Sequence, residues 1–119
     1  MHGKLRVLIL DDDPAITELL ADLLASDCAV TIANQIDAAM AALDIDGTDL
    51  LLCDYRLDGA PSTGFLEAVA LRYPTVRRVL MTGSPSREWQ PILDRGLVVA
   101  ALIKPFGLNQ LWALLRPNE

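Results

Sequence analysis

The sequence has little positive charge, few cysteines and no long hydrophobic run, and each of these absences argues against a class of protein. Ten Lys and Arg residues stand against 16 Asp and Glu residues, which gives a net charge of −6. Arg77-Arg78 is the only local basic pair, and the single histidine, His2, lies near the N-terminus. Because nucleic-acid backbones are bound by clustered Lys and Arg, direct nucleic-acid binding is disfavoured. No apolar run approaches the roughly 20 residues of a membrane-spanning helix, so no membrane association is expected.

Cys28 and Cys53 are the two cysteines. They are too few for a disulfide scaffold and lack the spacing of metal ligands, so we expect both to be small buried hydrophobic residues. Met1 to Lys4 lead directly into a predicted strand, without a signal peptide. These observations predict a reducing, cytoplasmic location.

Alternation of two hydrophobic patterns predicts an α/β fold in a single domain that spans residues 1–119. Short aliphatic and β-branched runs alternate with segments that have apolar residues at helical spacing. The predicted strands are residues 4–10, 28–33, 49–54, 76–82 and 97–103. This alternation favours a five-stranded, mostly parallel sheet with helices on both faces.

The helices are predicted with unequal clarity. Asp13 and Pro14 have the N-cap and first-turn signals of the first helix. The segment from Ser84 to Gly96 contains two prolines, which predicts either a short helix that starts near Pro91 or an irregular one. Residues 55–63 are predicted to be a loop. The other helices are predicted around residues 36–43 (closed by Asp46-Gly47), from Gly64 to Tyr73, and around residues 108–115, with Trp112 in the core.

Polar side chains lie at or just after the carboxyl ends of the predicted strands. In open α/β sheets, ligands bind in the crevice beyond these strand ends. Asp11 and Asp12 follow the first strand, Asp54 ends the third, Thr82 ends the fourth and Lys104 follows the fifth. Carboxylates crowded at one edge repel one another unless a cation compensates, and Mg²⁺ prefers such oxygen ligands. Lys104, at the end of a buried strand, needs an anionic partner. The sequence therefore predicts a magnesium site with a nearby ammonium group.

Four motifs in this order resemble the receiver domain of two-component response regulators. They are Asp11-Asp12 with Asp13-Pro14, Asp54-Tyr55-Arg56-Leu57, Thr82-Gly83, and Lys104-Pro105-Phe106. The resemblance covers the whole chain and implies a flavodoxin-like, doubly wound sheet with strand order 2-1-3-4-5. It also implies a role in a phosphorelay, with a histidine kinase or a phosphotransfer protein as partner.

The resemblance further implies a role for each site residue. Asp54 would be the phosphoacceptor, while Lys104 and Thr82 would bind phosphoryl oxygens. Asp12, Asp54 and the backbone carbonyl of Arg56 would bind Mg²⁺ directly, with Asp11 acting through water. The chain would catalyse only its own phosphorylation and dephosphorylation. An effector or a second copy would bind the face formed by the fourth helix, the fifth strand and the last helix.

Two positions depart from the receiver pattern. Asp58 stands where receivers usually have proline, and the loop from Asp58 to Thr63 is longer than usual, as in receivers attached to hybrid histidine kinases. Ala101 occupies the place of an aromatic switch residue. We therefore expect the Gly83–Gly96 segment to carry the conformational change, with Trp89 as its reporter.

Other functions fit the sequence less well. A haloacid-type phosphatase would have an Asp at Arg56, and a flavodoxin would have a Ser/Thr-rich loop after the first strand. Walker A and dinucleotide-binding glycine motifs are absent. The open alternative is an interaction module with the same fold that does not use phosphorylation.

Overall fold

The computed structural model describes residues 3–45 and 47–115. His2 and the Asp46 part of the predicted Asp46-Gly47 turn lie outside these residues.

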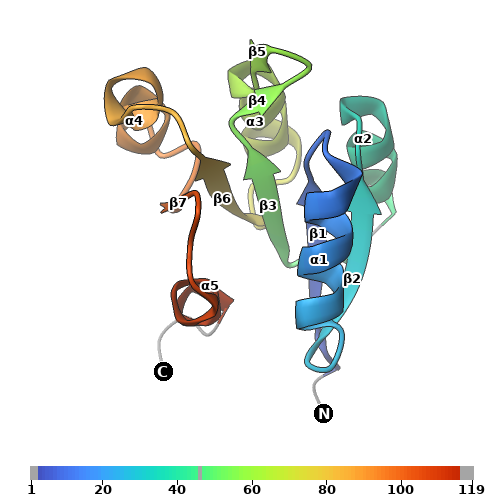
Figure 1. Ribbon diagram of the computed structural model, residues 1–119. Helices are drawn as coiled ribbons and strands as arrows, with labels where there is room; N and C mark the ends of the chain where they lie inside the picture. Colours follow the sequence, from blue (N-terminus) through green and yellow to red (C-terminus); the bar gives the residue numbers. More distant parts are fainter. Residues whose placement is uncertain (1–2, 46, 116–119) are drawn as a thin grey trace.

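A five-stranded parallel sheet has the order β2-β1-β3-β6-β7 (Figure 1). This is the predicted 2-1-3-4-5 order, because β4 and β5 form a separate small sheet. In register, Leu10 pairs with Cys53, Asp54 with Met81, and Thr82 with Ile103. The main strands are β1 (Leu5–Leu10), β2 (Cys28–Ala33), β3 (Leu50–Asp54), β6 (Arg77–Thr82) and β7 (Ala100–Ile103).

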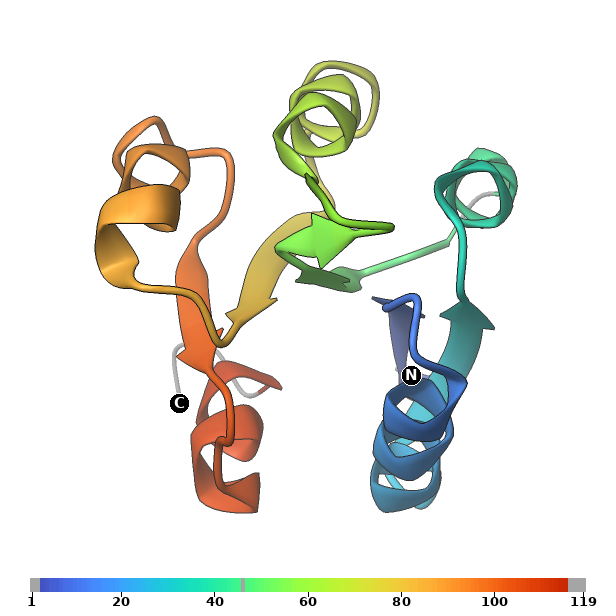
Figure 2. The same cartoon turned by 45° about the horizontal axis from the view of Figure 1, so that its top comes forward.

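Helices cover both faces of the sheet, because side chains alternate between two apolar cores along each central strand. Leu8 and Leu51 face the core of α2, α3 and α4, whereas Ile9 and Leu52 face that of α1 and α5. Figure 2 shows α2, α3 and α4 on one side of the sheet and α1 and α5 on the other. The helices are α1 (Pro14–Leu24), α2 (Ile36–Asp44), α3 (Thr63–Arg72), α4 (Ser86–Asp94) and α5 (Leu108–Leu115).

Several local predictions are confirmed. Asp13 caps α1 by accepting a hydrogen bond from the Ala15 N–H at 3.0 Å. Both cysteines are buried and free, and burial raises the pKa of the Cys53 thiol to about 12. Trp112 packs against the core on the α5 side, although it is only partly buried.

Within residues 3–45 and 47–115, no helix is long and apolar enough to cross a bilayer.

Of the two alternatives predicted for residues 84–96, the short helix that starts near Pro91 is wrong. α4 begins at Ser86 and contains Pro91 within it. Tertiary packing outweighs the helix-breaking proline, because Trp89 is buried and its indole N–H donates to the Ser84 carbonyl at 3.0 Å. The predicted strand over residues 97–103 is shorter than expected, since only Ala100–Ile103 pair with β6.

The predicted loop over residues 55–63 contains a β-hairpin. Its strands are β4 (Arg56–Leu57) and β5 (Ala60–Pro61), which pair antiparallel. Asp58 and Gly59 form the turn with φ values of 53° and 80°, both left-handed. Two left-handed residues give the tight hairpin turn that Asp-Gly sequences favour, so the signal was present in the sequence.

Candidate functional site

Three carboxylates meet at the carboxyl edge of the two central strands. Leu10 and Cys53 are neighbours in the sheet, so the acids that follow them lie side by side. One carboxylate oxygen from each of Asp11, Asp12 and Asp54 lies within 4.8 Å of the others. Asp11 is 1% exposed, whereas Asp12 is open to solvent. The structure thus brings together the three predicted acids.

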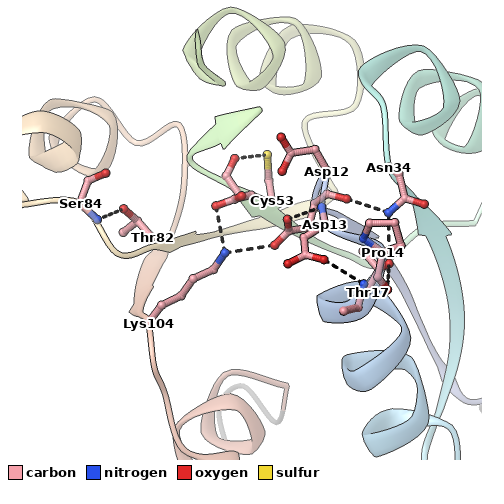
Figure 3. A network of polar contacts seen from close by, with 12 residues as sticks. Asp12, Asp13, Pro14, Thr17, Asn34, Cys53, Thr82, Ser84 and Lys104 are labelled. Atoms are coloured by element: carbon pink, nitrogen blue, oxygen red, sulfur yellow. Dashed lines mark hydrogen bonds and ion pairs between the residues drawn. The ribbon is translucent and has the colours of Figure 1, made fainter. Parts of the chain in front are cut away.

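Lys104 joins two of these acids from the loop after β7. Its ammonium Nζ donates to Asp11 Oδ2 at 3.1 Å and to Asp54 Oδ1 at 3.2 Å (Figure 3). The Lys104 side chain is partly buried, with 29% of its surface exposed. The predicted anionic partner of this lysine is therefore found in the site itself.

The charges of the site are incompletely balanced. Burial, together with the charge of Asp11, raises the pKa of Asp54 to about 6, although Lys104 partly opposes this. Burial disfavours the charge of Lys104, but its hydrogen bond to Asp11 and the negative charges of Asp54 and Asp11 outweigh that effect and raise its pKa. One ammonium faces three carboxylates. A small divalent cation with a preference for oxygen ligands fits this donor set.

A polar layer behind the site fixes Asp11. Asp11 Oδ1 accepts a hydrogen bond from the Asp13 N–H at 3.0 Å. The Asn34 side-chain amide donates to the Asp11 carbonyl at 2.8 Å and to Thr17 Oγ1 at 3.1 Å. Asn34 and Thr17 were not among the predicted site residues. Asn34 directly follows β2, so the rule that selected the other site residues would also have selected it.

Two predicted site residues make their contacts elsewhere. Thr82 is buried, and its hydroxyl oxygen accepts a hydrogen bond from the Ser84 N–H at 2.9 Å. Figure 3 shows Thr82 set apart from the acids, on the side of Ser84. The Arg56 guanidinium forms an ion pair with Glu88 on α4 at 2.9 Å. The predicted roles of the Thr82 hydroxyl and the Arg56 carbonyl remain predictions.

The residues directly after Asp54 connect the site to α4. The Tyr55 hydroxyl donates to the Glu88 carbonyl at 3.1 Å, and Arg56 binds the carboxylate of the same residue. Trp89, which follows Glu88, donates its indole N–H to the Ser84 carbonyl, and the Ser84 N–H in turn donates to the Thr82 hydroxyl oxygen. α4 is therefore linked to the site from both β3 and β6, and the link from β3 through Tyr55 and Arg56 was not predicted.

Comparison with known proteins assigns the chain to a family. Residues 7–116 match the family model described as the response regulator receiver domain. A CheY-like response regulator receiver domain from Methanospirillum hungatei JF-1 is 25% identical, with 95% of this chain and 91% of that chain covered and a TM-score of 0.87. The chain therefore belongs to the response regulator receiver domain family.

Of two further relatives, one is less similar in sequence and the other is a much longer protein. The response regulator protein TrrA from Thermotoga maritima, solved in complex with Mg²⁺ and BeF, is 20% identical over 95% of this chain and 96% of that chain, with a TM-score of 0.80. The hydrogenase transcriptional regulatory protein HoxA from Cupriavidus necator is 29% identical over 82 residues. That match covers 69% of this chain but only 17% of HoxA.

Proposed function

We propose that this chain is the phosphoacceptor of a two-component phosphorelay and that Asp54 takes up the phosphoryl group. The observation that carries the proposal is the position of Lys104, whose ammonium lies between the Asp11 and Asp54 carboxylates. An ammonium group beside a carboxylate nucleophile can neutralise charge that accumulates on a transferring phosphoryl group. Membership of the receiver family supports the same function.

The reaction needs one nucleophile and two groups that bind oxygen. An oxygen of ionised Asp54 attacks phosphorus, while the bond from phosphorus to the donor nitrogen of a phosphohistidine breaks. Lys104 binds one phosphoryl oxygen, and the Thr82 hydroxyl donates to another after giving up its contact with Ser84. The product is an acyl phosphate, which the same site hydrolyses. No separate substrate is turned over, so the chain is not an enzyme in the usual sense.

The acids supply the metal ligands in this proposal. Asp12, Asp54 and the Arg56 carbonyl would bind Mg²⁺ directly, and Asp11 through water. When bound, Mg²⁺ would neutralise negative charge on the phosphoryl oxygens. The donor set of three clustered carboxylates supports this assignment, as does the Mg²⁺ named in the complex of TrrA.

The proposed partners are a histidine kinase or phosphotransfer protein, in the cytoplasm, and an effector or second copy on the face of α4, β7 and α5.

An apolar hollow of about 380 Å³ adjoins Lys104 between α1 and α5. Ile16, Leu20 and Phe106 are among the residues that line it. A phosphodonor that reaches Asp54 would lie close to this hollow.

Incubation with acetyl phosphate and Mg²⁺ tests the proposal directly. Intact-mass spectrometry should show one added phosphoryl group on the wild type, which is lost under mild base as an acyl phosphate should be. The variant Asp54→Asn should take up none, because an amide is a poor nucleophile. Asp44→Asn, an exposed acid on α2 that pairs with Arg72, is the matched control and should be labelled like the wild type. Equal labelling of wild type and Asp54→Asn would remove the assignment to Asp54, whereas no labelling of the wild type would favour an interaction module that does not use phosphorylation.

A further inference from the structure

The hairpin of β4 and β5 reaches one of the proposed metal ligands. The Asp58 N–H donates a hydrogen bond to Asp12 Oδ2 at 2.9 Å. Among the residues that the structure describes, this is the only hydrogen bond recorded to the Asp12 carboxylate. Asp11 differs, because it is buried and bonded to both Lys104 and the Asp13 N–H. Asp12 therefore depends on the hairpin for its orientation.

The turn geometry makes this N–H available. In a two-residue hairpin turn, the first turn residue has no partner for its N–H inside the hairpin. The left-handed φ values of Asp58 and Gly59 set the turn so that this donor meets Asp12. The hairpin is anchored by buried Leu57 and by the Ser62 N–H, which donates to the Tyr55 carbonyl at 2.7 Å.

We propose that the turn Asp58-Gly59 is a positioning element for metal binding, which holds the Asp12 carboxylate beside Asp11 and Asp54. The inference rests on the metal site of the proposed function. A carboxylate has lone pairs for both an N–H donor and a metal ion, so the two interactions are compatible. Hydrogen bonds to metal ligands typically change metal affinity by about 10- to 100-fold.

Substitutions at Gly59 test the proposal, with isothermal titration of the protein with MgCl₂ as the measurement. Gly59→Val places a β-branched residue at a φ of 80°, where it is strained, while its Cβ meets no atom within 4 Å. It should weaken Mg²⁺ binding about 10- to 100-fold. Gly59→Asn should restore most of the affinity, because asparagine tolerates left-handed φ. Asp44→Asn, the exposed acid on α2 that pairs with Arg72, is the control and should bind within about threefold of wild type.

The outcomes separate this inference from the proposed function. If Gly59→Val binds Mg²⁺ like wild type, or if Gly59→Asn is as weak as Gly59→Val, the positioning role is wrong and the metal site stands. If wild type binds no Mg²⁺, both fail. Circular dichroism establishes that each variant is folded. Should Gly59→Val unfold, Gly59→Ala is the milder variant, and it must show a weaker affinity for the proposal to hold.

Discussion

The acid site and the α4 segment border the same edge of the sheet but are held in place differently. Asp54 ends β3, and Asp11 and Asp12 follow β1, so the paired strands of the central sheet fix the backbone positions of all three acids. α4 packs on the core through Trp89 and Ile92, and its polar links to the site are single contacts made by Tyr55, Arg56 and Trp89. Separate hydrogen bonds can be exchanged one at a time, whereas a strand end cannot move without its ladder. This difference supports the proposal that the acid site carries the chemistry and that α4 carries the response.

The largest expected effect is on the free energy of unfolding, because the crowded carboxylates destabilise the folded protein when no metal is bound. The pKa of Asp54 is about 6 in the folded protein, against an ordinary 3.8, so the folded state binds this proton more tightly than the unfolded chain. The Asp54 contribution to stability therefore falls as pH rises from about 4 to about 6. At about 1.4 kcal/mol per pKa unit, the loss is at most about 3 kcal/mol.

Urea unfolding in chelator-containing buffer measures this effect. The free energy of unfolding of Asp54→Asn, relative to wild type, should increase by up to about 3 kcal/mol between pH 4 and pH 7. Using the difference between the two proteins cancels the titration of the carboxylates that lie away from Asp54. A difference that stays constant over this range would show that the site is not electrostatically strained.

Binding of Mg²⁺ should offset the electrostatic destabilisation of the acid site by nearly the same free energy. A ligand that binds only the folded state at a hundredfold excess over its dissociation constant stabilises by about 2.7 kcal/mol. The melting temperature of wild type should therefore rise with Mg²⁺, and that of Asp12→Asn much less, because one proposed ligand is lost. Asp13→Asn is the control, since Asp13 caps α1 and should not bind the metal. Equal Mg²⁺ responses of Asp12→Asn and wild type would remove Asp12 from the site.

The smallest effect should be the response of α4. Trp89 is buried and bonded to Ser84, so its emission should lie at short wavelength and shift to the red if Thr82 leaves Ser84 for a phosphoryl group. The measurement uses Trp112→Phe protein, with and without phosphorylation. Thr82→Ala should abolish the shift, provided that it still accepts phosphate. A response of Trp112 with none from Trp89 would instead place the change in α5.

The sequence was sufficient for the sheet and for the acids because both depend on local patterns. Aliphatic runs define the strands, and Asp11, Asp54 and Lys104 come directly at or after strand ends. The order of the strands in the sheet was predicted from the family resemblance. The pairing of Leu10 with Cys53 agrees with that order. The same reasoning did not find the start of α4 at Ser86, because packing of Trp89 overrides the helix-breaking Pro91.

The hairpin shows a different reason for failure. Asp58-Gly59 is a recognisable turn signal, but strands of two residues carry no periodic pattern that would reveal the rest of the hairpin. Its hydrogen bond to Asp12 joins residues 46 positions apart in the sequence. No local rule predicts a contact of that kind, because it depends on how the loop lies over the site.

The basic pair Arg77-Arg78 has a consequence for how the molecule meets others. Arg77 donates to the Leu114 carbonyl at 2.7 Å, and Arg78 donates to the Leu97 and Val76 carbonyls at 2.7 and 2.8 Å. These guanidinium groups are engaged with the protein's own backbone and are less available to an anionic partner, while their charges are already included in the net charge of −6. The long-range field is therefore that of an anion. Encounter with a positively charged surface should be fast in dilute buffer and slow as salt screens the field.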